Sequence, residues 1–353
     1  MERFEGPIVH PQHWPEDLDH AGKRVVVIGS GATAITLVPA MADSGAQVTM
    51  LQRSPTYVAS RADQDGIANA LRKFLPDKLA YAITRWKNVG LQGLFYRRTR
   101  TRPEQIKGWL LALVRRQLPP GYDVATHFTP RYDPWDQRLC LVTNGDLFKG
   151  ISSGRISVVT DRIEAFTETG LTLKSGKTLE ADIIVTATGL NLVVMSGIDF
   201  SVDDAAINFA DTWSYKGMMY SDVPNLVQTF GYVNASWTLR ADLNAEYVGR
   251  LLNHMDANGV RQCTPRLREQ DENMARRPWI DDFSAGYMKR VMHLFPSQGD
   301  HDPWRNTQDY KLDKQMIRHA ALEDGALAFS NPVAAAAGAG TPSGADSRAE
   351  EAA

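Results

Sequence analysis

The sequence is poor in the residues and patterns that define several classes of protein. It has two cysteines, Cys140 and Cys263, which stand far apart and form no CxxC pair. This argues against a disulfide framework, a zinc site and a dithiol redox centre, and it is typical of a protein in a reducing cytosol. The eight histidines show no metal-ligand spacing, so we expect no bound metal ion.

Long apolar runs and an excess of one charge are also missing. The apolar run Trp109–Val114 is far too short to span a bilayer. Residues Met1–Gly6 lack the apolar segment of a signal peptide, so we expect a cytoplasmic protein. The formal net charge of −2 gives no indication of nucleic acid as a partner, and 43% hydrophobic residues are ordinary for a globular chain.

The sequence does contain a strand, a glycine-rich turn and a helix in direct succession. Arg24–Ile28 is short, apolar and β-branched, as in a buried parallel strand. The turn Gly29–Ala34 has the pattern GxGxxA and leads into apolar residues at helical spacing, and Gln47–Gln52 follows as a second strand. Such a βαβ unit predicts the α/β fold class, with a Rossmann-like dinucleotide-binding domain.

The glycine-rich turn supplies the residue types that a bound pyrophosphate requires. Gly29 permits the tight turn, Gly31 lets the backbone approach the phosphates, and the free N–H groups of the helix N-terminus face them. We therefore assign five residues of the turn to cofactor binding: Gly29, Ser30, Gly31, Ala32 and Thr33. A plain strand–helix turn built from small residues is the alternative.

The end of the second strand indicates which nucleotide is bound. An NAD or FAD site carries Asp or Glu at this place, to bind the ribose 2′-hydroxyl. Here the strand ends in Gln52, Arg53 and Ser54, and a guanidinium with an adjacent hydroxyl suits a 2′-phosphate. We therefore predict NADPH, bound by Arg53 and Ser54; an arginine in a surface loop is the alternative.

The rest of the chain divides by composition into further parts. Residues 63–130 are punctuated by proline and glycine and predict an insertion of several short helices. From residue 155 the pattern returns to strands, and a buried strand ends at Thr188 and Gly189. The predicted parts are an extended linker (1–20), an NADPH domain (21–62 and 131–189), the helical insertion (63–130), a C-terminal part (190–330) and a disordered tail (331–353).

The helical insertion is strongly basic, with nine lysine and arginine side chains between Arg85 and Arg116. Three interpretations are open. The first is a solvated helical face, and the second is a wall for the anionic cofactors. The third is a weak peripheral attachment to an anionic membrane, since basic helical segments are attracted to anionic lipids.

The N-terminal segment resembles the fingerprint of an enzyme family. Residues 4–15 read FEGPIVHPQHWP and match the pattern FxGxxxHxxxW(P), with the glycine-rich turn a short interval later. This is similar to the Baeyer–Villiger monooxygenases, which are class B flavoprotein monooxygenases. A chance loop rich in proline, histidine and tryptophan is the alternative. The fingerprint residues are Phe4, Gly6, His10, Trp14 and Pro15. For His10 we consider two roles, coupling of two domains and a buried, hydrogen-bonded histidine.

Further segments extend the resemblance over residues 4 to about 329, and the subgroup of the ethionamide-activating monooxygenase is the most similar. The segment 52–55 matches the family's clamp for the 2′-phosphate. The segment 136–140 resembles the one with the family's active-site arginine, which would be Arg138; an ion pair with Asp136 is the alternative. Thr188 and Gly189 resemble the motif where the chain returns to the FAD domain, and they are assigned to cofactor binding.

The resemblance implies an NADPH- and FAD-dependent monooxygenase. In this family NADPH reduces FAD, and the reduced flavin and O₂ give a C4a-peroxyflavin, while the protein positions and stabilises the cofactor. The peroxyflavin oxidises ketones to esters, or sulfur in sulfides and thioamides, so a small ketone, sulfide or thioamide is the expected substrate. Arg138 would stabilise the peroxy anion, because a guanidinium keeps its proton at working pH.

The resemblance includes one large departure. Members of the family carry an FAD-binding Rossmann unit ahead of the fingerprint, whereas Met1–Arg3 alone precede it here. We therefore expect an N-terminally truncated chain whose residues 190–330 are the second part of a split FAD domain. A non-catalytic NADPH-binding fragment unable to hold FAD is the alternative. A relative of the pyridine nucleotide–disulfide oxidoreductases is a third hypothesis, for which Cys140 and Cys263 are too isolated.

Overall fold

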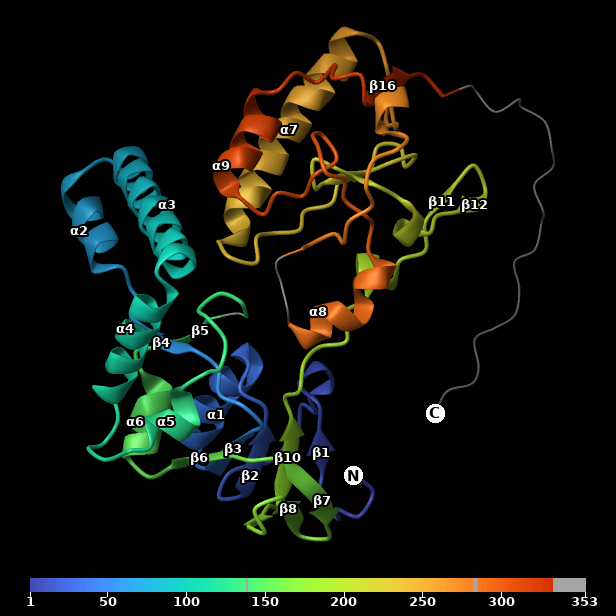
Figure 1. The fold of residues 1–353 in the computed structure, drawn as a ribbon. Helices are drawn as coiled ribbons and strands as arrows, with labels where there is room; N and C mark the ends of the chain where they lie inside the picture. Colours follow the sequence, from blue (N-terminus) through green and yellow to red (C-terminus); the bar gives the residue numbers. More distant parts are fainter. Residues whose placement is uncertain (138, 282–284, 333–353) are drawn as a thin grey trace.

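The computed structural model describes residues 1–137, 139–281 and 285–332. Its N-terminal half is built on a five-stranded sheet in which every neighbouring pair is parallel, and this confirms the predicted α/β fold class (Figure 1). The strands that the sequence predicted on either side of the glycine-rich turn pair directly with each other. In spatial order the strands are β1 (Ile8–Val9), β10 (Ile183–Thr186), β2 (Arg24–Ile28), β3 (Gln47–Gln52) and β6 (Ile156–Thr160).

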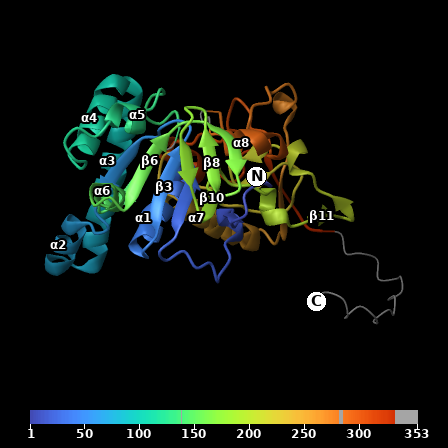
Figure 2. The same ribbon diagram turned by 90° about the horizontal axis from the view of Figure 1, so that it is seen from below.

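Alternation along the strands separates two cores on the two faces of this sheet. Val25 and Val27 pack with the helices α1 (Ala32–Asp43) and α6 (Asp146–Ser152). Val26 packs on the opposite face, against an antiparallel three-stranded sheet. That smaller sheet consists of β7 (Ile163–Thr167), β8 (Gly170–Leu173) and β9 (Thr178–Glu180). The result is a three-layered domain, and Figure 2 shows β6, β3 and β10 in this order across its parallel sheet, where β2 lies between β3 and β10.

The helical insertion differs from the expectation of several short helices. A parallel strand pair, β4 (Val58–Arg61) and β5 (Cys140–Thr143), flanks it. The longest helix, α3, runs for 25 residues and includes Gly90 and Gly93, which we expected to interrupt it. Each glycine costs a helix roughly 1 kcal/mol, which a long run of good helix formers offsets. The helices are α2 (Gly66–Phe74), α3 (Asp77–Thr101), α4 (Pro103–Arg115) and α5 (Val124–Phe128).

The N-terminal segment is not wholly the extended linker that we expected before Lys23. Ile8 and Val9 form an edge strand of the parallel sheet, where they pair with Ile184 and Val185. The strand is two residues long, too short for its sequence pattern to predict it. Val9 is buried, so the segment is anchored to the domain that follows it.

Residues 190–332 form a second body around the long helix α7 (Trp237–Ala257), as Figure 1 shows. A separate apolar core lies between this helix and short two-stranded sheets. The strands are β11 (Ser201–Val202), β12 (Ala205–Ala206), β13 (Ser214–Tyr215), β14 (Met219–Tyr220), β15 (Gln262–Pro265) and β16 (Leu327–Ser330), and the shorter helices are α8 (Gly286–Val291) and α9 (Tyr310–Asp313). Of the predicted disordered tail, residues 333–353 lie outside the described residues.

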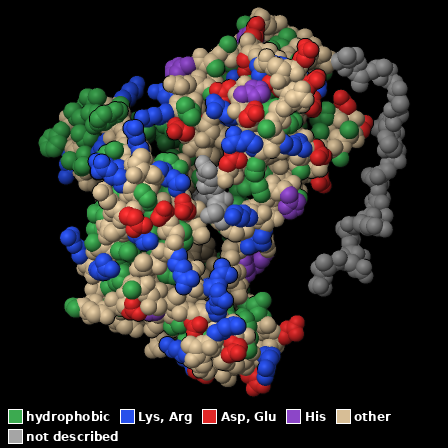
Figure 3. All heavy atoms as spheres, in the orientation of Figure 1, with side chains coloured by type: hydrophobic (Ala, Val, Ile, Leu, Met, Phe, Trp, Pro, Cys, Tyr) green, Lys and Arg blue, Asp and Glu red, His purple; other side chains and the backbone are tan. Residues whose placement is uncertain are grey.

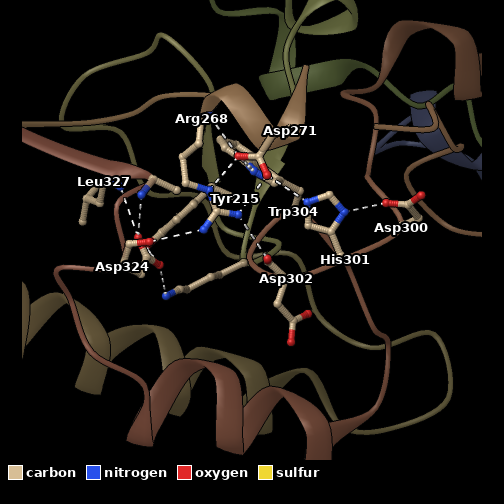
Figure 4. A network of polar contacts seen from close by, with 11 residues as sticks. Tyr215, Arg268, Asp271, Asp300, His301, Asp302, Trp304, Asp324 and Leu327 are labelled. Atoms are coloured by element: carbon tan, nitrogen blue, oxygen red, sulfur yellow. Dashed lines mark hydrogen bonds and ion pairs between the residues drawn. The ribbon is translucent and has the colours of Figure 1, made fainter. Parts of the chain in front are cut away.

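A buried carboxylate holds the loops of the second body together (Figure 4). Asp271 is fully buried and accepts hydrogen bonds from Arg268, from His301 at 2.8 Å and from the indole of Trp304 at 2.9 Å. Burial opposes its ionisation, but these donors hold the pKa of Asp271 well below its usual range. The carboxylate therefore stays charged at neutral pH and joins two segments that are distant in sequence, residues 268–271 and 301–304.

Candidate functional site

A crevice of about 970 Å³ opens at the carboxyl edge of the parallel sheet. Loops that follow β2, β3, β6 and β10 form its walls, together with residues of β5 and α8. In open α/β sheets, ligands bind outside the carboxyl ends of the strands, so this is the expected place for a ligand. All the residues assigned to cofactor binding from the sequence line this crevice: Gly29, Ser30, Gly31, Ala32, Thr33, Arg53, Ser54, Thr188 and Gly189.

The two glycines of the turn meet different surroundings. Gly29 has a φ of +138°, and a Cβ on it would lie 2.3 Å from the carbonyl oxygen of Ala187. Gly29 is therefore needed because β2 and β10 approach each other closely where they end. A Cβ on Gly31 would meet no protein atom within 4 Å, so this position faces the open crevice.

The N-terminus of α1 presents backbone N–H donors without a side-chain cap to the same crevice. Gly31 is its N-cap residue and offers no side chain to bond the first N–H groups. These groups and the helix dipole favour an anion at this end of the helix. The turn itself is fixed by Ser30, whose hydroxyl donates to the carbonyl oxygen of Ser54 at 3.1 Å. The site can thus hold a phosphate group without rearrangement of the backbone.

Two further arginines, which the sequence did not single out, lie with Arg53. A hollow of about 400 Å³ adjoins the crevice and is lined by Arg53, Arg131 and Arg162. Within the described residues, none of these guanidinium groups forms an ion pair with a carboxylate. Arg162 stands two residues beyond β6, the neighbour of β3, so a topological argument from parallel strands could have found it. Arg131 directly follows the helical insertion, and no sequence pattern points to it.

One carboxylate also faces the crevice. Asp161 follows β6 and accepts hydrogen bonds from the backbone N–H groups of Ser175 at 3.2 Å and Arg162. Interactions with Ser175 and with the Arg162 N–H lower the pKa of Asp161, so it is charged at neutral pH. Its oxygens are engaged by the protein backbone, whereas the nearby guanidinium groups are available to a ligand.

The far wall of the crevice comes from the second body of the chain. Tyr287 and Arg290 of α8 line it next to Gly189. A Cβ on Gly189 would lie 3.4 Å from the Tyr287 Cβ and 3.5 Å from an Arg290 nitrogen, which also donates to the carbonyl oxygen of Leu190 at 3.4 Å. These residues lie about a hundred positions beyond Gly189 in the sequence, and no sequence pattern connected them with it.

The fingerprint residues do not line the crevice; they support it. Nε2 of His10 lies 3.2 Å from the carbonyl oxygen of Gly189, which is a crevice residue. The amide of Gln12 exchanges two hydrogen bonds with the backbone of Asn191, at 3.1 and 2.7 Å. The segment thereby holds the end of β10, where the chain leaves the three-layered domain, which is the first body. The contact of His10 fits both roles that we considered for it, coupling of two domains and a hydrogen-bonded histidine.

The remaining fingerprint residues pack against the sheet. Phe4 is buried in the core between the parallel sheet and the small antiparallel sheet. A Cβ on Gly6 would lie 2.6 Å from the carbonyl oxygen of Asp182 and 2.7 Å from the Phe4 ring, so a glycine is required there. Trp14 is half-buried against the core on the helical side, and Pro15 is exposed.

Arg138, the predicted active-site residue, lies outside the described residues. Its neighbour Asp136 accepts a hydrogen bond from Arg100 of α3 at 2.8 Å. The two cysteines lie in different bodies, Cys140 on β5 beside the crevice and Cys263 on β15 in the second core. Across the parts of the chain that the structure describes, no group of three or more His, Cys, Asp or Glu side chains could hold a metal ion.

Comparison with protein families agrees with this geometry. The model of the family described as FMO-like, flavin-binding monooxygenase-like, matches residues 1–202. The chain belongs to the flavin-binding monooxygenase-like family. This confirms the class of enzyme that the fingerprint and the glycine-rich turn indicated.

Similar proteins in this family are named as FAD-dependent enzymes. The FAD-containing monooxygenase EthA of Mycobacterium tuberculosis is 52% identical over 330 residues, which are 93% of this chain and 67% of EthA. The probable FAD-binding monooxygenase AlmA of Acinetobacter baylyi is 48% identical, over 93% of this chain and 66% of AlmA. The chain thus spans about two thirds of the length of these family members.

Solved structures show the same fold at lower sequence identity. An oxidised steroid monooxygenase bound to NADP matches 94% of this chain and 71% of its own, with a TM-score of 0.66 and 19% identity. OTEMO in an FAD-bound form matches 77% of this chain and 60% of its own, with a TM-score of 0.57 and 19% identity. These matches confirm the Rossmann-like architecture of this member of the family.

The contrast between the two glycines of the turn gives a first test. Gly29→Ala should lower the free energy of unfolding by at least about 1–3 kcal/mol, because the new methyl group meets the Ala187 carbonyl at a positive φ. Gly31→Ala should cost less than about 1 kcal/mol, since its Cβ has free space and its φ is ordinary. Urea unfolding of both variants measures the difference. Equal losses in the free energy of unfolding of the two variants would contradict the close approach of β2 and β10.

Proposed function

We propose that the crevice binds NADPH and that the chain uses it in a flavin-dependent monooxygenase reaction. One observation carries the nucleotide part of this proposal. The uncapped N-terminus of α1 and the guanidinium groups of Arg53, Arg131 and Arg162 lie at the same edge of the parallel sheet. A dinucleotide with an extra phosphate needs both features, one for the pyrophosphate and one for the 2′-phosphate.

The order of the strands gives the proposed direction of the nucleotide. Gly29 to Thr33 follow the central strand β2 and would hold the pyrophosphate. Arg53 and Arg162 follow β3 and β6 on one side of it, so the adenosine 2′-phosphate belongs there. Thr188 and Gly189 follow β10 on the other side, next to Tyr287 of α8. The nicotinamide end would therefore lie between the two bodies of the chain.

FAD is proposed as the second cofactor, on the basis of the family and of its FAD-containing members. When bound, the flavin supplies the acceptor for the hydride and the transfer of oxygen from O₂. The crevice residues of this chain would orient the NADPH, and α8 would restrict the access of water to its nicotinamide end. Within the described residues, the strand–glycine turn–helix unit of a dinucleotide site occurs once, at β2 and α1.

The proposed substrates are small ketones, which would give esters or lactones, and sulfides or thioamides, which would be oxidised at sulfur. This substrate range follows from the resemblance to Baeyer–Villiger monooxygenases. Arg138 keeps its proposed role as the cation that stabilises the reactive anion.

Removal of the proposed phosphate clamp should change which nucleotide the chain prefers. Arg53→Ala combined with Arg162→Ala should weaken NADPH binding by about a hundredfold or more, because each charge-assisted hydrogen bond contributes about 1.5–3 kcal/mol and two arginines are lost. NADH binding should change little, since NADH has no 2′-phosphate. Isothermal titration of both nucleotides measures this, with Arg72→Ala, an exposed arginine of α2, as the control. An unchanged preference for NADPH in the double variant would refute the assignment.

Binding of flavin distinguishes the enzyme from a non-catalytic NADPH-binding protein. The purified chain is incubated with FAD, passed through a gel-filtration column and examined for flavin absorbance. The proposal predicts that flavin stays with the protein and that NADPH bleaches it in the absence of oxygen, faster than NADH does. Loss of all flavin on the column, with NADPH binding retained, would favour the non-catalytic alternative.

A further inference from the structure

The hairpin formed by α2 and α3 exposes large apolar side chains to solvent. Phe74, which ends α2, is 84% exposed, and Trp86 of α3 is 80% exposed. Single exposed apolar residues are common, but contiguous groups of them mark interaction surfaces. We call the following set the hairpin patch: Ile67, Phe74, Leu79, Ile83, Trp86 and Leu94, each exposed by more than a third. Figure 3 shows hydrophobic side chains gathered over this part of the molecule, at the upper left.

The spacing of these residues places them on one side of each helix. Leu79, Ile83, Trp86 and Leu94 are separated by four, three and eight positions, which keeps them on one face of α3. Ile67 and Phe74 are seven positions apart and share a face of α2. The patch residues of each helix therefore share one face of that helix, and loop residues do not contribute to the patch.

The opposite face of α3 is already attached to the protein. Arg85 forms a salt bridge of 2.7 Å with Asp242 of α7. The amide of Gln92 donates to the carbonyl oxygen of Asn234 at 3.0 Å. The helix is thus held to the second body by its polar face, and its apolar face points away from that attachment. A rigid helix presented in this way suits docking onto an external surface.

The charge around the hairpin patch identifies what it docks on. Residues 66–115 contain eleven Lys and Arg side chains and two acidic ones, in a chain whose formal net charge is −2. Exposed basic residues lie at both ends of the patch. They are Arg72, Lys73 and Lys78 near the tip of the hairpin and Arg97, Arg98 and Arg102 at the end of α3. An apolar stripe with tryptophan and phenylalanine, bordered by lysine and arginine, is the pattern of helices that lie in the headgroup region of anionic bilayers.

We propose that the α2–α3 hairpin is a docking site for an anionic lipid bilayer. The hairpin lies in the plane of the membrane surface, with Phe74 and Trp86 inserted among the acyl chains near the headgroups. The basic residues contact lipid phosphates around them. The proposed attachment is peripheral. In the described ranges no helix is long and apolar enough to cross a membrane.

The same charges argue against a second copy of this chain as the occupant of the patch. A symmetric pair places the same surface of both copies face to face. Two strongly basic rims would then meet, and like charges in contact disfavour such an association. An anionic lipid surface complements both the apolar stripe and the rim, whereas a second copy complements the stripe alone.

Co-sedimentation of the full chain with lipid vesicles tests this proposal. Vesicles of phosphatidylcholine with phosphatidylglycerol should carry the protein into the pellet, and vesicles of phosphatidylcholine alone should bind it at least about tenfold more weakly, because they lack the anionic charge. Raising the salt from about 0.1 M to 1 M should reduce binding to the anionic vesicles, since screening shortens the range of the attraction from about 10 Å to about 3 Å.

Variants separate the apolar contribution from the basic one. Phe74→Ser with Trp86→Ser should weaken binding to the anionic vesicles at least about tenfold, because the apolar anchors are lost. Arg97→Ala with Arg98→Ala should weaken it too and reduce its dependence on salt. Leu252→Ser, which alters a leucine of α7 that is 58% exposed, is the matched control and should bind as the unaltered chain does. Thermal unfolding of each variant checks that the fold is kept.

Two results would overturn the proposal. One is a failure of the unaltered chain to bind anionic vesicles, or binding that Phe74→Ser with Trp86→Ser leaves unchanged. The other is an unaltered chain that self-associates in sedimentation velocity experiments through this patch, and becomes monomeric in the serine variant, without any vesicle binding. The second result would identify another copy of the chain as the partner.

Discussion

The architecture depends on the close approach of two parallel strands where they end. β2 and β10 are neighbours, and the turn after β2 leaves so little room that a Cβ on Gly29 would lie 2.3 Å from the Ala187 carbonyl oxygen. This contact sets the direction in which α1 begins, and so the position of its uncapped N–H groups. The ends of β3 and β6 then bring the arginine side chains to the same edge. Parallel strand direction and one glycine thus define the crevice.

The first body and the second body meet at this crevice, and the fingerprint segment stabilises their junction. His10 and Gln12 contact the backbone at Gly189 and Asn191, where the chain leaves β10. About a hundred residues later in the sequence, Tyr287 and Arg290 of α8 pack next to Gly189. The role of such a segment need not be chemical, since its contacts at the junction fix how the two bodies face a shared ligand. In the second body, the buried carboxylate of Asp271 fixes loops in a comparable way (Figure 4).

Local patterns in the sequence predicted the parts of the structure that local physics determines. The β2–α1–β3 unit, the hairpin between β8 and β9 and the residues of the glycine-rich turn could be predicted, because strand composition and turn chemistry act over a few residues. The length of α3 could not, since two glycines cost less than the rest of the helix contributes. Arg131, Tyr287 and Arg290 reach the crevice through tertiary packing. No local sequence pattern connects these residues with the glycine-rich turn.

Hydrogen exchange with and without NADP⁺ tests the nucleotide site most directly, since it reports on the backbone groups proposed to bind the pyrophosphate. NADP⁺ should slow exchange of the amides at residues 29–33. Exchange should also slow in α8, residues 286–291, which covers the other end of the crevice. Unchanged exchange at residues 29–33 with a saturating nucleotide, or protection confined to other parts of the chain, would contradict the assignment of this crevice to NADPH.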